Sequence, residues 1–132
     1  MYLLDTNVIS ELRRPRPSQA VLRWVADVSA EHLFLSAVTV GEIQAGIEIT
    51  RDQDPAKAQA LEDWLDQVVD TYGVLAMDAA AFRQWARFKH RKSDTLLEDA
   101  MIAATAAVHG LTVVTRNVVD FRSFDVEIVN PF

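Results

Sequence analysis

The longest apolar stretch of the chain lies near its carboxyl end. Two acids, Glu98 and Asp99, precede it, and small apolar residues then continue as far as Val108. A helix that is apolar on all sides is a buried helix, and the glycine in His109-Gly110 is typical of a left-handed helix stop. The continuous apolar run Leu111–Thr115 indicates a strand of a parallel sheet that is covered on both faces. The pattern therefore predicts a buried helix that begins with carboxylates, followed by a buried strand.

The rest of the chain alternates short apolar runs with segments of helical periodicity. Four further strands are predicted, at Tyr2–Leu4, Leu33–Ala37, Val74–Ala76 and Val126–Val129. Helices are expected at Val8–Arg14, Ser18–Val28, Thr39–Thr50, Asp54–Tyr72 (with Gly73 as its stop) and Asp78–His90, and Ser18, Asp54 and Asp78 are their predicted N-caps. Strands that alternate with helices predict a single α/β domain over residues 1–132 with a mostly parallel sheet.

Polar residues follow the predicted strands at positions that should meet. Asp5 follows the first strand, Glu42 lies early in the helix after the second, and Asn117 follows the fourth. Asp99 begins the helix that leads into the fourth strand. Because ligands of parallel α/β sheets gather at the carboxyl ends of the strands, we expect these side chains to form one site.

Most of these acids also have a structural explanation. Asp5 can be the N-cap of a short helix. Thr39-x-x-Glu42 and Thr95-x-x-Glu98 both have the spacing of a capping box. Asp99 has no such local explanation, although periodicity does not separate it from Glu98, because everything downstream is apolar. The local pattern therefore leaves structural and catalytic roles open.

Composition restricts the function classes. The chain has 132 residues, of which 50% are hydrophobic and 24% charged, as is ordinary for one globular core. It contains no cysteine, which excludes disulfides, thiol catalysis and cysteine-based zinc sites. The net charge of −6 argues against a protein that coats nucleic acid, but not against an enzyme that gathers acids around a metal. Without a long apolar run or a signal peptide, we expect a cytoplasmic protein with no membrane partner.

Four segments carry a resemblance that spans nearly the whole chain: LLDTNVISEL, LSAVTVGEIQAGI, DAMIAATAAVHGLTVVTRNVVDF and the terminal VNPF. In this order and spacing they resemble PIN-domain proteins, and more narrowly the VapC-type toxins of bacterial toxin–antitoxin pairs. The resemblance implies a PIN-like three-layer sandwich with a central, mostly parallel five-stranded sheet flanked by helices. It also implies a homodimer and a cognate antitoxin protein that blocks the acids.

The same resemblance implies an endoribonuclease that cleaves RNA with Mg²⁺, or with Mn²⁺ in its place, and that inhibits translation. Asp5, Glu42 and Asp99 match the three most characteristic acids of the family. Asp5 and Asp99 are expected to be the principal metal ligands, and Glu42 to act through water. Mg²⁺ suits this set because it prefers oxygen ligands and keeps several waters.

One position departs from the family pattern. Asn117 stands where family members often place a fourth acid, so one negative charge is lost and the number of metal ions, one or two, stays open. Asp120 can partly compensate, and Thr6 and Thr115 resemble the hydroxyl residues that often line such sites. The expected role of Asn117 is to support the site from its edge.

Basic and aromatic residues provide candidates for RNA contacts. Arg13, Arg14 and Arg116 follow the strands that lead to the acids, and arginine can bind phosphate. The basic run Arg87–Lys92 either guides RNA or complements a helix dipole. The three tryptophans have apolar neighbours at helical spacing, which predicts a core position and leaves base stacking as the alternative.

Two other functions compete with the ribonuclease. A catalytically weak PIN module that binds RNA or protein is favoured by Asn117 in place of an acid. An aspartate-based phosphotransferase with Asp5 as its nucleophile would need a second aspartate where Asn7 stands, and a lysine near Arg116. The ribonuclease is therefore the preferred hypothesis.

Overall fold

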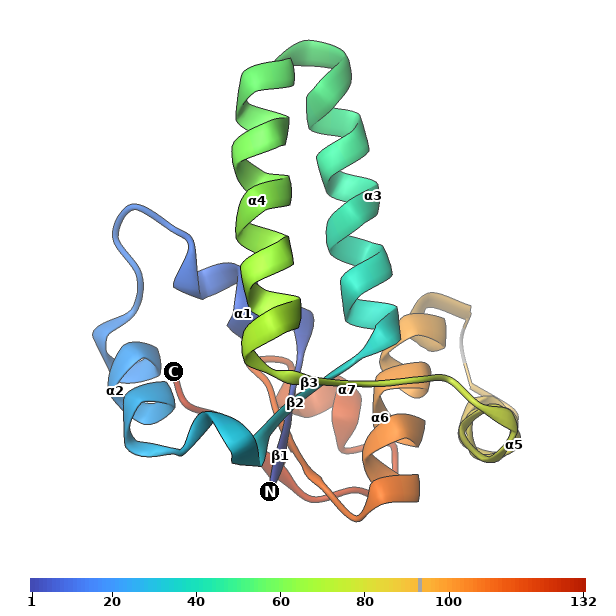
Figure 1. The fold of residues 1–132 in the computed structure, drawn as a ribbon. Coiled ribbons are helices and arrows are strands. Elements are labelled where there is room, and N and C mark those ends of the chain that lie inside the picture. Colours follow the sequence, from blue (N-terminus) through green and yellow to red (C-terminus); the bar gives the residue numbers. More distant parts are fainter. Residues whose placement is uncertain (93) are drawn as a thin grey trace.

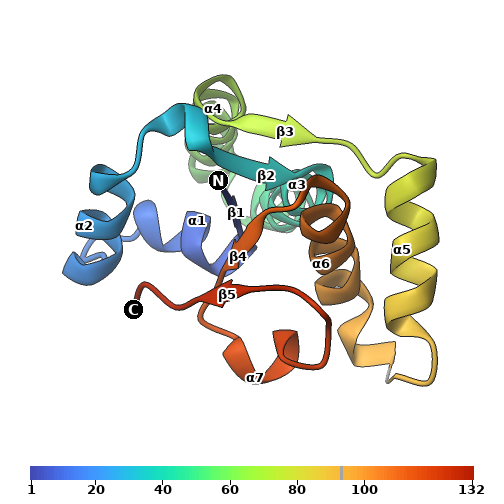
Figure 2. The ribbon, with the colours of Figure 1, turned by 90° about the horizontal axis from the view of Figure 1, so that it is seen from below.

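Five short strands form one all-parallel sheet at the centre of the computed structural model, which describes residues 1–92 and 94–132. Their order is β3-β2-β1-β4-β5; Figure 1 shows the whole fold, and Figure 2 labels all five strands in this order. The strands are β1 (Tyr2–Leu4), β2 (Leu33–Ser36), β3 (Gly73–Leu75), β4 (Thr112–Val114) and β5 (Ile128–Val129). The predicted α/β class with a five-stranded sheet is confirmed.

Helices connect the strands and cover both faces of the sheet. They are α1 (Thr6–Leu12), α2 (Gln19–Asp27), α3 (Ala37–Gln53), α4 (Pro55–Thr71), α5 (Ala79–Lys89), α6 (Leu97–His109) and α7 (Val118–Phe121), with 3₁₀ turns at Ala30–His32 and Asp94–Leu96. The predicted caps are confirmed, since Ser18, Asp54 and Asp78 each accept a bond from a backbone N–H three residues on. The sequence prediction missed α7, because four residues are too few to show a helical period.

Successive strand residues point to opposite faces, and this alternation divides the core. Leu3 and Val113 pack with α6 and α7 on one face. Leu4 and Val114 pack with α1 and α2 on the other. Figure 2 shows α1 and α2 on one side of the strands and α5 and α6 on the other. The sandwich therefore has three layers, as predicted.

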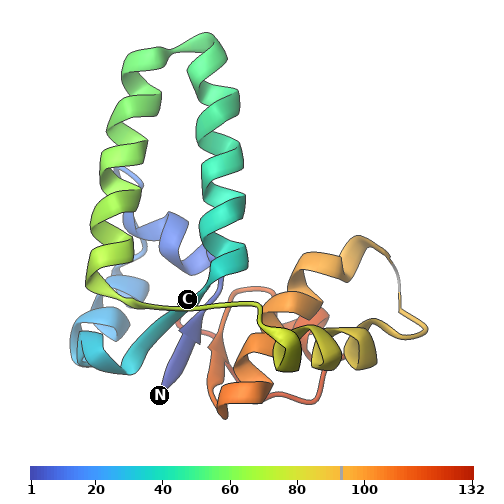
Figure 3. The ribbon, with the colours of Figure 1, turned by 45° about the vertical axis from the view of Figure 1, so that its right-hand side comes forward.

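The α3–α4 hairpin stands away from the sheet (Figures 1 and 3). It has a small apolar core of its own, formed by Ile47, Ala58 and Leu65. Near the sheet, Val68 of α4 joins the core that includes Leu4. The two helices thus begin and end at the sheet but pair mainly with each other.

Both predicted capping boxes are wrong. The N-cap of α3 is Ser36, whose Oγ accepts a bond from the Val38 N–H at 3.2 Å, so Thr39 lies inside the helix. The N-cap of α6 is Leu96, which has no side-chain cap bond. The threonine of each pair is therefore not the N-cap, since Thr39 lies inside α3 and Thr95 lies in the 3₁₀ turn before α6.

The two glycines predicted as helix stops differ. Gly110 is left-handed, with a φ of 66°, as predicted. Gly73 instead begins β3, where an added Cβ would lie 2.7 Å from Phe34 Cδ1. The close approach of an aromatic ring, and not a helix end, requires glycine there.

Of the helices in the described part of the chain, none is both long and apolar enough to cross a bilayer.

Candidate active site at the carboxyl edge of the sheet

Asp5 is the residue at the centre of the polar edge. It directly follows β1, caps α1 and is only 3% exposed. Its Oδ1 accepts a bond from the Thr6 N–H at 2.8 Å, and its Oδ2 accepts bonds from the Thr115 hydroxyl at 2.7 Å and the Asn7 amide at 3.1 Å. These donors are all neutral. Burial raises the pKa of the Asp5 carboxyl, and the three hydrogen bonds offset only part of that rise.

Glu42 lies in the second turn of α3 and is half-buried. Thr6 Oγ1 lies 3.0 Å from Glu42 Oε1 and 3.1 Å from Thr39 Oγ1, so α1 and α3 are joined at the site. Burial raises the pKa of Glu42 to about 7, and a hydrogen bond with Glu98 and the negative charges of Glu98 and Asp5 add to the rise. Glu42 therefore belongs to the acid cluster and does not cap a helix.

Asp99 lies in the first turn of α6. Burial raises its pKa to about 6, and the charges of Asp5, Asp120 and Glu98 contribute in that order. The structure thus brings Asp5, Glu42 and Asp99 together from three different elements, as the strand-end argument predicts. Asp120, from α7, lies near enough to act on Asp99.

Glu98 is a member of this cluster that sequence reasoning missed. Its carboxyl is exposed but hydrogen-bonds Glu42. The capping-box spacing gave it a structural explanation, which the observed helix start removes. The signal that could have found it is the pair of adjacent acids, Glu98 and Asp99, at the start of an otherwise apolar helix.

Asn7 is the second residue that the sequence argument did not assign to the site. Its amide nitrogen donates to Asp5 Oδ2 at 3.1 Å and to Thr115 Oγ1 at 3.4 Å. Its amide oxygen accepts a bond from the Arg116 N–H at 3.3 Å. The side chain therefore links the ends of β1 and β4 and holds the Asp5 carboxylate in place.

Thr115 and Asn117 form the β4 side of the site. Thr115 is fully buried, donates to Asp5 and accepts a bond from the Asn117 N–H at 2.9 Å. Asn117 is exposed, and as the N-cap of α7 it makes no side-chain cap bond. Its backbone thus supports Asp5 through Thr115, while its side chain lies at the rim.

The donor set suits a hard cation. Every candidate ligand is an oxygen atom, which is the preference of Mg²⁺ and Mn²⁺. In the described chain, which omits only Ser93, no three acidic or histidine side chains are arranged to ligate one ion together. Mg²⁺ is commonly held by one or two carboxylates and water, and Asp5 with Asp99 meets that requirement. Carboxylates whose pKa values are raised by burial and by neighbouring acids, as for Glu42 and Asp99, are also those that a cation stabilises most.

The three arginines have different surroundings. Arg13 lines a hollow beside Glu42, and its guanidinium carbon lies 5.8 Å from the centre of the Trp64 ring. Arg14 pairs with Glu11 at 3.6 Å. Arg116 lies 4.5 Å from the centre of the Phe132 ring. All three are exposed, and Arg13 borders the same hollow as Glu42.

Comparisons with known proteins agree with this architecture. The PIN domain family model matches residues 2–126. The chain is 36% identical to Toxin FitB of Neisseria gonorrhoeae over 100% of this chain and 99% of that protein. It is 34% identical to VapC ribonuclease Y4jK of Sinorhizobium fredii over 100% and 98% of the two chains. The crystal structure of FitAcB from Neisseria gonorrhoeae matches with a TM-score of 0.89 and 35% identity, covering 99% of this chain and 98% of that one.

The matched region contains β1, the α3 acid, α6 and β4, which together build the acidic edge. The family match, the full-length relatives and the shared fold lead to one assignment: this chain is a PIN-domain protein of the VapC-type toxin family.

Proposed function

We propose that this chain is a metal-dependent endoribonuclease and the toxin of a toxin–antitoxin pair that inhibits translation. The observation that carries the proposal is the convergence of Asp5, Glu42 and Asp99 at the carboxyl edge of a parallel sheet, with raised pKa values on all three. Two full-length relatives support it through their names, since one is called a toxin and the other a ribonuclease.

The residues divide the chemistry among them. Asp5 and Asp99 would hold Mg²⁺, which when bound supplies positive charge for the phosphoryl oxygens and acidifies a water. The neutral donors Thr6, Thr115 and Asn7 fix the Asp5 carboxylate without neutralising its charge. Preorganised ligands of this kind avoid the cost of rearrangement during the reaction.

Glu42 is suited to handling the proton. Its half-buried carboxyl, whose pKa is about 7 before a metal binds, is the group of the cluster that can take a proton from the attacking water. Glu98 shares its hydrogen bond and so helps to set that pKa. The ester bond that breaks joins phosphorus to a ribose oxygen, and the departing oxygen must receive a proton in turn.

The test is cleavage of mixed cellular RNA by the purified chain with Mg²⁺, with Mn²⁺ and with a chelator. We expect cleavage with either metal and none with the chelator. Asp99→Asn should lower the cleavage rate by more than about 100-fold, because even residues that only orient metal ligands contribute about 10–100-fold. Asp27→Asn is the matched control, because Asp27 is exposed at the end of α2.

Two results would contradict the proposal. Metal-independent cleavage that survives in Asp99→Asn would mean a contaminating nuclease. RNA binding without cleavage in either metal would favour the weak PIN module, which the exposed amide of Asn117 in place of an acid suggests. Light scattering and co-purification with the product of a neighbouring reading frame would test the homodimer and the antitoxin.

A further inference from the structure

A hollow lies directly beside the acids, between α1 and the α3–α4 hairpin. Its cavity volume is about 190 Å³, many times the ~10–15 Å³ that one water requires. Thr6 and Glu42 form part of its lining and also belong to the acid cluster. The hollow is thus continuous with the candidate active site.

The walls of the hollow combine an aromatic surface with polar groups. Trp64 and three aliphatic side chains line it, together with polar groups from Ser10, Arg13 and Thr50; the aliphatic residues are Ile43, Ile47 and Leu61. Trp64 is only half-buried, so the prediction of a purely core position for it is incomplete. The Arg13 guanidinium lies near its ring, where it adds positive charge to the rim.

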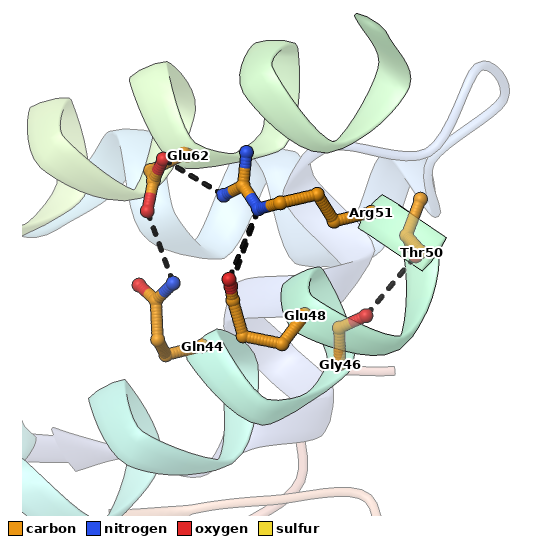
Figure 4. Close-up of polar contacts among 6 residues, drawn as sticks. All are labelled: Gln44, Gly46, Glu48, Thr50, Arg51 and Glu62. Carbon is orange, nitrogen blue, oxygen red and sulfur yellow. Dashed lines mark hydrogen bonds and ion pairs between the residues drawn. The ribbon is translucent and has the colours of Figure 1, made fainter. Parts of the chain in front are cut away.

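Contacts between the two helices hold this wall in shape (Figure 4). Arg51 bonds Glu48 at 3.0 Å and Glu62 at 2.9 Å, and Gln44 bonds Glu62 at 3.0 Å. The Thr50 hydroxyl donates to the Gly46 carbonyl at 3.0 Å, which ties it to its own helix. These contacts thus join the two helices that supply most of the wall.

We infer that this hollow is a base-binding subsite, which takes the base of the RNA nucleotide next to the bond that the acids cleave. The inference rests on the proposed ribonuclease function. An aromatic and aliphatic wall suits the flat face of a base, and the polar groups at the margin suit its edges. Arg13 at the rim suits the phosphate that follows, whose negative charge the acids themselves would repel.

Gly46 permits a direct test because it lines the hollow and an added Cβ there meets nothing within 4 Å. Gly46→Leu should therefore place a side chain in the hollow, and its Cβ meets no neighbour. Replacing a helix-interior glycine also favours folding. Gly41→Leu is the matched control, because Gly41 lies on the same helix outside the hollow and its Cβ also meets nothing within 4 Å.

The experiment measures binding, so that it does not depend on turnover. Each change is made in the Asp99→Asn chain, and fluorescence anisotropy with Mg²⁺ follows two probes: a random-sequence RNA octanucleotide, and a ribose–phosphate octamer without bases. Gly46→Leu should weaken binding of the RNA about tenfold, as for the loss of one stacked base. It should leave binding of the octamer unchanged, and Gly41→Leu should change neither.

Arg13→Gln should weaken binding of both probes and lower the salt dependence, since a phosphate contact does not require the base. Equal weakening of both probes by Gly46→Leu would overturn the base subsite, and so would no weakening of either. If Gly46→Leu abolished co-purification of the proposed antitoxin and left RNA binding unchanged, the hollow would be assigned to that protein instead. RNA binding without cleavage by the unaltered chain would refute the ribonuclease proposal separately, because the binding assay does not use turnover.

Discussion

Two glutamates of the α3–α4 hairpin have pKa values that are shifted in opposite directions. Glu42, at the sheet end of α3, has a pKa raised to about 7 by burial and by Glu98. Glu62, on α4, has a lowered pKa because Gln44 and Arg51 hydrogen-bond its carboxylate. The hairpin thus pairs its acids with donors, whereas the sheet edge places acids against one another. Acids placed against one another are typical of a binding or catalytic site. The difference therefore separates the acidic edge of the sheet from the ion pairs of the hairpin, which are structural.

The largest difference expected between the two regions comes from neutralising Glu42 and Glu62 in turn. Glu42→Gln keeps the shape and the acceptor for Thr6 but removes the group that handles the proton, so RNA cleavage in Mg²⁺ should fall by about 10–100-fold. Glu62→Gln should leave the cleavage rate unchanged, because its partners lie within the hairpin. Initial rates on one RNA measure both. Equal losses would remove the distinction between the two regions.

Local pattern predicted that Asp5 and Asp99 lie at one edge of the sheet, since strand ends and helix starts follow from it, whereas their roles as metal ligands followed only from the family resemblance. The caps Ser18 and Asp54 are local features in the same sense, and both are confirmed. The hydrogen bond between Glu42 and Glu98 is not local, because it depends on how α3 and α6 pack against the sheet. Local spacing therefore favoured capping boxes for Glu42 and Glu98, whereas tertiary packing brings these two residues into a cluster of acids.

The hollow beside the acids shows the same limit. Helical periodicity correctly predicts that Trp64 lies on an apolar face of its helix. It does not show that this face lines an open hollow that Arg13 also borders. Nor does the chain order show that Asn7 spans from β1 to β4. Contacts between elements distant in sequence decide these features, and the sheet order must be known before they can be inferred.

A smaller effect is expected on stability as a function of pH. Glu42 and Asp99 have pKa values of about 7 and about 6 when folded, raised from 4.5 and 3.8. Such groups bind their protons more tightly in the folded chain than in the unfolded chain. Their contribution to stability is therefore fully present below the pKa that they have in the unfolded chain, and it is lost as the pH rises through their pKa in the folded chain. With a chelator present, the free energy of unfolding should fall by about 1–3 kcal/mol between about pH 5 and pH 8.

Urea unfolding at the two pH values measures this loss. Glu42→Gln should show a smaller loss than the unaltered chain, whereas Glu62→Gln should show the same loss, since the lowered pKa of Glu62 places its titration below this window. Adding Mg²⁺ at the higher pH should restore stability, because a ligand that binds only the folded state stabilises it. A stability that rises over this range would contradict the assignment of mutual repulsion to the sheet edge.

The smallest effect concerns the ion pairs of the hairpin (Figure 4). Arg51 is about one-third exposed, at 33%, and its partners Glu48 and Glu62 are 53% and 32% exposed. Solvent screens such pairs, so Arg51→Met, which retains most of the aliphatic stem, should lower the free energy of unfolding only slightly. High salt should shrink that difference.

RNA cleavage should stay within about twofold of the unaltered chain, because apolar contacts among Ile47, Ala58 and Leu65 also hold the hairpin together. Parallel measurement of unfolding and cleavage separates the two roles. A loss of cleavage as large as that of Glu42→Gln, with stability unchanged, would mean that Arg51 contacts RNA. The hairpin would then contribute a second face to the functional surface, besides the one that lines the hollow, and the contrast between paired and unpaired acids would no longer mark the limit of that surface.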